Sequence, residues 1–238
     1  AGDGNIVNGG FLLTAGGDDT STAYNGVLTG AGGLTKTGSG TLTLSGTNTY
    51  TGATTIIDGG IITSGAAKID NASAVSVSSG ATLTLGGDET VGSIAGDGNI
   101  VNGGFLLTAG GDDTSTAYNG VLTGAGGLTK TGTGTLTLSG ANDYTGDTTI
   151  IDGGLTTSGA AKIDDASAVS VASGATLTLG GAETVGSIAG DGNIVNGGFL
   201  LTAGGDNTST AYNGVLSGAG GLTKTGSGTL TLWGANDY

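Results

Sequence analysis

The side chains that could do chemistry in this chain are few in kind, and carboxylates dominate them. The chain has 17 Asp and 2 Glu against 5 Lys, with no His, Arg or Cys. Catalysis would therefore need Asp, Glu, Lys or Tyr side chains that converge in one cleft. The carboxylates instead recur once per sequence repeat beside glycines, at Asp3, Asp18-Asp19, Asp58, Asp70 and Asp88-Glu89. Because Asp beside Gly is typical of turns, we expect no catalytic residue and no cofactor site.

One carboxylate pair has the potential to bind a metal ion. Asp18 and Asp19 are adjacent, and the repeat returns them as Asp112 and Asp113. Calcium needs about six to eight oxygen ligands. The third copy also replaces the second carboxylate of the pair with Asn207. We therefore rank turn formation above calcium binding for all four aspartates and expect no metal site.

Two further patterns raise the question of ligand binding. Tyr24 and Tyr50, with their copies, could stack on sugars, but rings that cover turns with the hydroxyl in water are the simpler interpretation. The Thr-x-Thr motifs at Thr41–Thr43 and Thr82–Thr84 could order water as an ice-binding face does. Such a face needs the motif on every coil, and here it occurs in about half of them, so ordinary strand filling is favoured.

Composition and charge exclude several classes of protein. The net charge is −14, and a nucleic-acid partner is excluded because phosphate backbones need clustered Lys or Arg. The 55 glycines occur without proline, which excludes collagen, and the apolar content is too high for disorder. Without Cys the chain must be stabilised by backbone hydrogen bonds and an apolar core. No apolar run is long enough to span a bilayer, so we expect no membrane insertion of this segment.

The elements that position these residues follow from a 94-residue repeat. The motif AGDGNIVNGG begins at Ala1, Ala95 and Ala189, and the first two copies differ at nine positions. Near-identical tandem units are typical of a solenoid, in which each unit contacts only its neighbours. We therefore predict one continuous solenoid made of repeats 1–94 and 95–188 and a partial repeat 189–238.

Short segments with period-two alternation predict β-strands throughout and almost no helix. The peptides at Thr41–Leu44 and Ala74–Val77 place aliphatic side chains on one face and hydroxyls on the other. Glycine-rich turns would also allow antiparallel hairpins, but the repeat favours coils of ~20–25 residues that stack in parallel. We predict an all-β, right-handed parallel β-helix with about four coils per repeat and about ten in all, on the order of 50 Å long.

The alternation also predicts which side chains form the core. The expected inward residues are Leu42, Leu44, Val75, Val77, Leu83 and Leu85, joined by Phe11, Leu13, Ile57, Ile69 and Ile94 and by their copies. The expected outward ladders contain Thr35, Thr41, Thr43, Ser76, Thr82 and Thr84. Strict alternation would send Lys36 inward, and we expect a glycine corner to turn it outward. Trp233 stands at the outward position that Ser45 and Ser139 occupy in the other copies, and we assign it no function.

A resemblance to a known family rests on the run Gly33–Gly46, which is followed by Asn48, Tyr50 and the peptide Asp58-Gly59-Gly60. This run resembles the passenger-associated strand repeat of autotransporters. The pattern recurs at Gly127–Gly154 and, truncated, at Gly221–Tyr238, and similar connecting coils extend the resemblance over nearly the whole chain. The resemblance implies a right-handed β-helix that is displayed on or secreted from a Gram-negative cell and acts in adhesion, aggregation or biofilm formation.

The predicted function is a structural and adhesive spacer. The main alternative is a glycan-processing β-helix enzyme, followed by an ice-binding or a calcium-stiffened adhesin. Near-identity of the copies argues against the enzyme, because a catalytic site would make one copy distinct. We expect this chain to be a segment of a longer rod that self-associates through its edges or ends and binds a host or matrix glycan or protein receptor.

Overall fold

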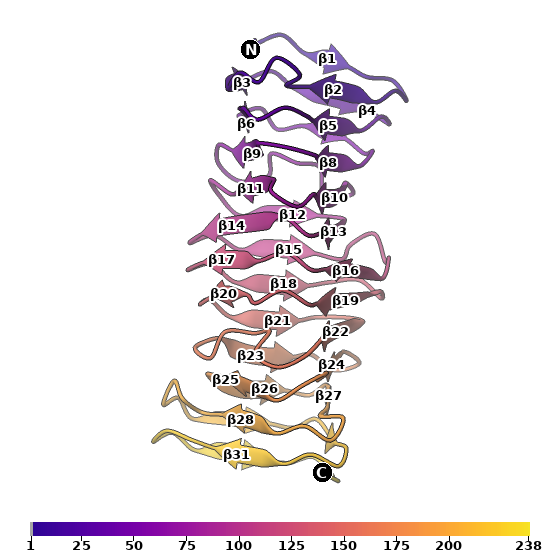
Figure 1. Cartoon of the computed structure of the whole chain (residues 1–238). Coiled ribbons are helices and arrows are strands. Elements are labelled where there is room, and N and C mark those ends of the chain that lie inside the picture. Colours follow the sequence, from indigo (N-terminus) through magenta and orange to yellow (C-terminus); the bar gives the residue numbers. More distant parts are fainter. Residues whose placement is uncertain (1) are drawn as a thin grey trace.

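The chain forms a single rod of stacked β coils (Figure 1). The structure is a computed structural model that describes residues 2–238. Its 32 strands are two to five residues long, and their pairings are parallel. The described residues contain no α-helix, and therefore none that could cross a bilayer. The parallel β-solenoid predicted from the sequence is thus confirmed, while its right hand stays a prediction.

Each full coil contributes one strand to each of three faces, which we name I, II and III in the order in which the chain visits them. Face I contains β1 (Ile6–Val7), β4 (Leu28–Gly30), β7 (Thr49–Tyr50), β12 (Glu89–Val91), β15 (Leu107–Ala109), β18 (Leu128–Lys130), β21 (Thr148–Ile150), β23 (Ala168–Val171), β26 (Ser187–Gly190), β29 (Thr210–Tyr212) and β32 (Leu230–Leu232). Face II contains β2 (Leu13–Ala15), β5 (Leu34–Lys36), β8 (Thr54–Ile56), β10 (Ala74–Val77), β13 (Ser93–Gly96), β16 (Thr116–Tyr118), β19 (Thr135–Leu138), β22 (Gly154–Thr157), β24 (Thr176–Thr178), β27 (Asn193–Val195) and β30 (Leu216–Ser217). Face III contains β3 (Thr22–Tyr24), β6 (Thr41–Leu44), β9 (Gly60–Thr63), β11 (Thr82–Thr84), β14 (Asn99–Gly103), β17 (Leu122–Gly124), β20 (Asp143–Tyr144), β25 (Glu183–Val185), β28 (Leu201–Ala203) and β31 (Leu222–Lys224).

Only face II is one uninterrupted sheet, with 11 strands, so the rod has about eleven turns. On face I, residues 64–73 form a loop where a strand would lie between β7 and β12. On face III, residues 158–167 form the equivalent loop between β20 and β25. We call these two segments the insert loops. They are related by the sequence repeat and yet lie on different faces of the rod.

The insert loops lie on different faces because the repeat does not fill a whole number of turns. One repeat runs from β1 on face I to β14 on face III and spans 13 strands and one insert loop. At three positions per turn, this is four turns and two further faces. The repeat therefore holds slightly more than the four or so coils predicted, because a coil has about 20 residues, the lower end of the predicted range, as the inter-coil partners Asn48 and Lys68 show. Equivalent side chains of consecutive copies point in directions one third of a turn apart.

The core is a continuous column of aliphatic side chains along the rod axis. The predicted inward residues that are buried are Leu42, Leu44, Ile69, Val75, Val77, Leu83, Leu85 and Ile94. Leu13 is partly buried in the first coil, and its copies Leu107 and Leu201 are fully buried. These residues confirm the alternation, since Leu42 and Leu44 face inward while Thr41 and Thr43 between them are partly exposed.

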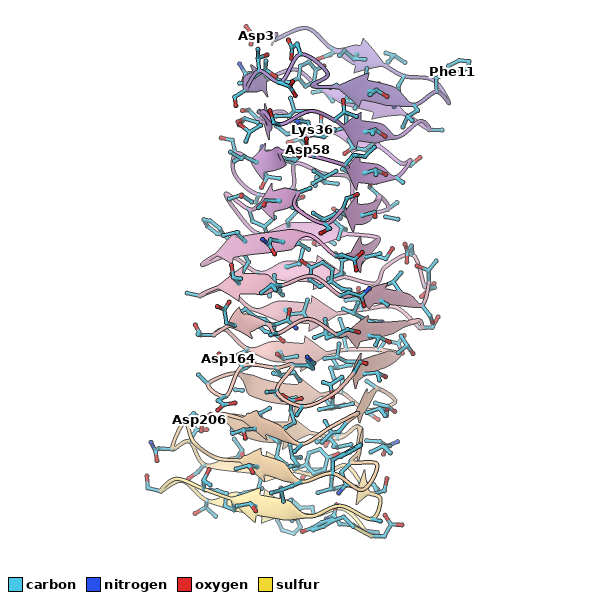
Figure 2. All side chains as sticks on the ribbon, viewed as in Figure 1. Asp3, Phe11, Lys36, Asp58, Asp164 and Asp206 are labelled. Carbon is cyan, nitrogen blue, oxygen red and sulfur yellow. The ribbon has the colours of Figure 1, made fainter. Side chains whose placement is uncertain are left out.

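Two predicted core residues were wrong, Phe11 and Ile57, with exposed fractions of 82% and 49%. Strand β8 ends with Ile56 facing inward, so Ile57 comes after the strand at a corner and points outward. Phe11 lies in a turn closed by its own N–H, which donates to the Asn8 carbonyl, and its ring projects from the rod (Figure 2). The copies that are exposed for the same reasons are Phe105, Ile151 and Phe199.

Lys36 and most tyrosines were also predicted wrongly, because they lie inside the rod. Lys36 is buried, and its Nζ donates to the carbonyls of Thr37 and Gly38 at 2.5 and 2.6 Å. The corner therefore binds the ammonium from within instead of turning the side chain outward. The fully buried tyrosines are Tyr50, Tyr118, Tyr144 and Tyr212. Burial raises the pKa of Tyr50, and rings in this position cannot stack on a sugar.

The outward hydroxyl ladders do not run the full length of the rod. On face II, Thr35 aligns with Thr55, Ser76 and then Ala95, so the hydroxyl row ends within one repeat. Thr35 itself is only 8% exposed, because it is packed between its neighbours in the ladder. Trp233 is exposed, as its outward position predicts, and nothing in the structure explains the substitution.

Candidate functional site

The acidic pairs that were considered for calcium are turn residues, and each aspartate has at least one carboxylate oxygen in a hydrogen bond. Asp19 and Asp113 have φ values of 59° and 60°, in the left-handed region that Asp and Asn tolerate better than most residues. Their Oδ1 atoms accept the N–H of Ser39 and Thr133 in the next coil, at 2.8 and 2.7 Å. Asn207 has a φ of 63° and accepts the equivalent bond at 2.9 Å. The position therefore requires a side-chain oxygen and does not require a charge.

The first aspartate of each pair is likewise engaged. Asp18 Oδ1 accepts the N–H of Thr20 at 3.2 Å, and this bond lowers the pKa of Asp18. Asp112 accepts the hydroxyl of Ser93 at 2.6 Å and both the N–H and hydroxyl of Thr114. Burial raises the pKa of Asp112, but these bonds outweigh it and hold the pKa below its ordinary value. Among residues 2–238, no three His, Cys, Asp or Glu side chains are grouped so that they could hold a metal ion.

A column of buried polar side chains replaces the missing strand at the first insert loop. Asn48 Oδ1 accepts the N–H of Leu28 at 2.8 Å, and its Nδ2 donates to the Lys68 carbonyl at 2.6 Å. Glu89 Oε1 accepts the N–H groups of Lys68 and Ile69, both at 3.0 Å. Side chains thus continue the inter-coil hydrogen bonding of face I through a segment that has no strand.

The second copy builds the same column on face III. Asn142 accepts the N–H of Leu122 at 2.9 Å and donates to the Lys162 carbonyl at 2.8 Å. Glu183 Oε1 accepts the N–H groups of Lys162 and Ile163 at 2.8 and 3.0 Å. Its other oxygen, Oε2, is buried and has no hydrogen-bond partner.

These are the only two glutamates of the chain, and both are buried, with exposed fractions of 0% for Glu89 and 2% for Glu183. Desolvation raises the pKa of each to about 7, against the opposing effect of the backbone hydrogen bonds. The sequence prediction grouped Glu89 with Asp88 as turn residues and was wrong for Glu89. The alternation of β12, which faces Glu89 and Val91 inward, was the signal that could have found it.

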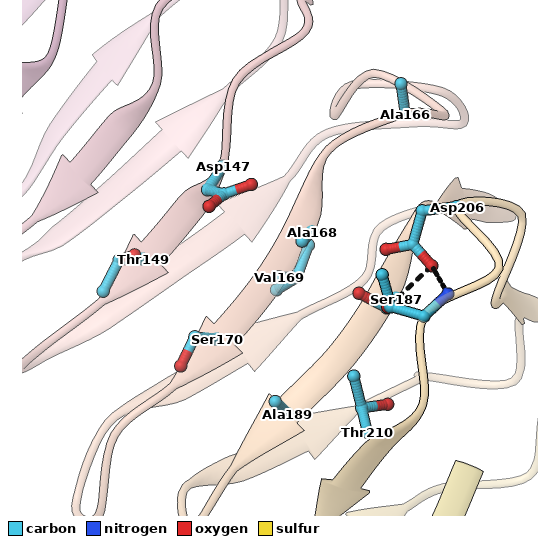
Figure 3. A pocket seen from close by; sticks show the side chains of 11 residues that line it. Asp147, Thr149, Ala166, Ala168, Val169, Ser170, Ser187, Ala189, Asp206 and Thr210 are labelled. Carbon is cyan, nitrogen blue, oxygen red and sulfur yellow. Dashed lines mark hydrogen bonds between the residues drawn. The ribbon is translucent and has the colours of Figure 1, made fainter. Parts of the chain in front are cut away.

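One groove of about 440 Å³ opens on the outside of face I, across the end of the second copy and the start of the third (Figure 3). Small side chains from β21, β23 and β26 form its floor, and Asp147 and Asp206 lie at its margins. The corner before β26 consists of Gly186 alone, which leaves the groove open between longer corners. Asp147 and Asp206 precede strands that are three coils apart, and the Asp206 carboxylate bonds to Ser187 of β26, which lies two coils from the strand that follows Asp147 (Figure 3).

Comparison with known protein families gives a match to the passenger-associated-transport-repeat at residues 34–63, 128–156 and 222–238. The first match covers β5 to β9, and the second begins at the equivalent strand, β18. Comparisons with curated proteins and with solved structures give no significant match. The resemblance recognised in the sequence is therefore confirmed at all three repeats, within a parallel β-solenoid.

Proposed function

Because the chain carries three passenger-associated-transport repeats in one parallel β-solenoid, we propose that it is a stiff spacer in an autotransporter passenger, displayed on or secreted from a bacterial cell, and that it acts in adhesion, aggregation or biofilm formation. The main support for a spacer is that these repeats share one continuous apolar core. In a solenoid each coil is held by its neighbours, so length can change by whole repeats without a new core.

A structural role is also supported by how the polar side chains are used. Many of the turn carboxylates accept backbone N–H groups of their own or a neighbouring coil, as Asp19 and Asp113 do. The two buried glutamates bind backbone N–H groups of the insert loops. These hydrogen bonds give the polar side chains a structural role, and an acidic surface favours the solubility of a long rod.

The spacer function is tested by cell-surface display of arrays that differ only in repeat number. Each added repeat of four and two-thirds turns lengthens the rod by about 22 Å. Cells that display four repeats should therefore settle and adhere faster than cells that display one. A flexible, unfolded linker with the same number of residues on the same anchor is the matched control.

Two results would contradict the proposal. Settling and adhesion that do not depend on repeat number would show that the rod is not a spacer in contact between cells. Turnover of pectin, alginate or another acidic glycan by the purified chain would instead support the enzymatic alternative. The purified chain is expected to leave such glycans unchanged, with or without calcium.

A further inference from the structure

We propose that Glu89 and Glu183 are proton-operated latches, which hold the insert loops closed when their carboxyl groups are neutral and release them when the carboxyl groups ionise. The inference does not depend on the proposed spacer function. It rests on the position of each carboxyl inside the rod, on the bonds that it makes to a loop without a strand, and on the charges around it.

The latch holds the middle of the insert loop, whose two ends have bonds of their own. The Ser64 N–H donates to the Leu44 carbonyl, and the Ser73 hydroxyl donates to the Gly52 carbonyl. In the first insert loop, the Glu89 carboxyl accepts the N–H groups of Lys68 and Ile69, and Asn48 binds the Lys68 carbonyl. Ile69 is 1% exposed, so these bonds also keep its side chain in the core. The same loop contains Ala67 with a φ of 53°, a conformation that is strained for alanine. Loss of the carboxyl contact would therefore favour loop opening.

Burial makes the latch sensitive to its own charge. The charge of Glu89 acts on buried Tyr50 of β7, Lys68 and Asp70 lie in the loop, and Asp88 is beside Glu89 in the chain. Glu183 faces the corresponding groups, Tyr144, Lys162, Asp164 and Asp165, with Ala182 in place of Asp88. Among the described residues, no lysine amine forms a hydrogen bond with either carboxyl. Ionisation therefore puts a negative charge in the interior without a bonded cation.

The direction of the pH effect follows from the raised pKa of both glutamates. The value is about 7 in the closed structure against an ordinary value of 4.5, so the neutral carboxyl binds the closed loop better. Closure is strongest below about pH 4.5 and is lost as the pH rises through about 7. In Glu183 the proton would be held on Oε2, the buried oxygen without a partner, while Oε1 accepts both N–H groups.

Opening should remain local, because the coils above and below each insert loop keep their own ladders. Strand β10, which follows the first insert loop, pairs along all four residues with β13 and along Val75–Val77 with β8. The latch occurs once per repeat, on face I for Glu89 and on face III for Glu183. A longer array would present an acid-closed loop to each side of the rod in turn.

The direct test uses the fact that the chain has only two glutamates. Carbon-13 labelling of glutamate gives NMR signals for these two carboxyls alone, and both should titrate near pH 7. Amide hydrogen exchange, corrected for the intrinsic rates, should show that protection of residues 64–73 and 158–167 falls at least tenfold between pH 5 and pH 8. Residues 82–84 of β11 should keep their protection over the same range.

Variants distinguish loop opening caused by ionisation of the glutamates from a general change of stability with pH. Glu89→Gln imitates the neutral carboxyl, so it should abolish the pH dependence in residues 64–73 and leave that in residues 158–167 intact. Asp70→Asn removes a neighbouring acid and should leave both loops pH-dependent. Glutamates that titrate near 4.5, loop protection that does not change with pH, or unchanged behaviour in Glu89→Gln would each overturn the proposal. If Glu89→Gln fails to fold, the titration of the unmodified chain decides.

Discussion

At the scale of single residues, side-chain oxygens that accept backbone N–H groups recur at the same positions in every repeat. Asn207 replaces the aspartate found at Asp19 and Asp113 and keeps the same bond to the next coil. Asn48 and Glu89 go further and replace backbone groups of a missing strand. Polar residues in this rod therefore complete the hydrogen bonding that short strands leave open.

Two substitutions of Asp113 should therefore have different effects on stability. Asp113→Asn keeps the acceptor and should change stability by less than about 0.5 kcal/mol. Asp113→Ala removes the acceptor and places alanine at a positive φ, so it should destabilise by about 1–2 kcal/mol. Urea unfolding of the two variants gives the comparison, and an equal loss in both would show that the charge is what matters.

The same contacts predict that the rod does not depend on calcium. Asp18 and Asp112 each accept the N–H group two residues further on, which fixes their orientation without a metal ion. A chelator should therefore leave Tm unchanged. A Tm that rises with calcium concentration, and that loses this rise in Asp112→Asn, would assign a metal site to the pair.

Single-residue environments were the hardest feature to predict from the sequence. Period-two alternation correctly indicates that Lys36 points inward, but hydrophobicity argued against it, and only the corner carbonyls explain how the ammonium is accommodated. Glu89 was missed for a similar reason. Alternation points it inward, but its role as an acceptor depends on a loop about 20 residues earlier in the chain. Partners that lie one coil away cannot be identified until the coil length is known.

At the scale of elements, the strands were predictable and the corners were not. Thr41–Leu44 and Ala74–Val77 are strands with alternating burial, as their sequence patterns predicted. Ile57 and Phe11 fall just outside strands, where alternation no longer determines direction. The insert loops were also missed. Residues 64–73 contain the buried Ile69, as a strand would, but they form no strand.

Adjacent isoleucines give a matched test of where β8 ends. Ile56 is fully buried and Ile57 is 49% exposed, although the two residues differ in nothing but position. Ile56→Ala should destabilise the rod by about 2–5 kcal/mol, because it leaves a cavity in the core. Ile57→Ala should cost less than about 1 kcal/mol, since its side chain already contacts water. Urea unfolding midpoints measure both, and similar losses would contradict the observed corner.

At the scale of the whole molecule, the mismatch between repeat and coil determines how the rod presents its surface. A feature that occurs once per repeat appears on face I, then on face III, and then on face II. The exposed phenylalanines follow this rule, because Phe11, Phe105 and Phe199 precede strands of faces II, I and III. Adding one repeat therefore turns the far end of the rod as well as moving it outward.

The sequence repeat predicted the solenoid and its approximate length but not this rotation. Rotation depends on the coil length, and a coil of about 20 residues divides 94 into four turns and two-thirds, whereas slightly longer coils would divide it into four. A difference of about three residues per coil thus decides whether equivalent residues of consecutive repeats align along the rod. The glycine-rich turns of the sequence do not reveal this difference.

Helical reconstruction by cryo-electron microscopy of a long array of identical repeats would measure the rise and the rotation between consecutive repeats. We expect parallel coils about 4.8 Å apart, with each repeat related to the next by a rise of about 22 Å and a rotation of about 120°. Ile57 and its copies should accordingly point to three sides of the rod in succession. A reconstruction in which repeats are related by a rise without rotation, or in which the strands pair antiparallel, would contradict this expectation.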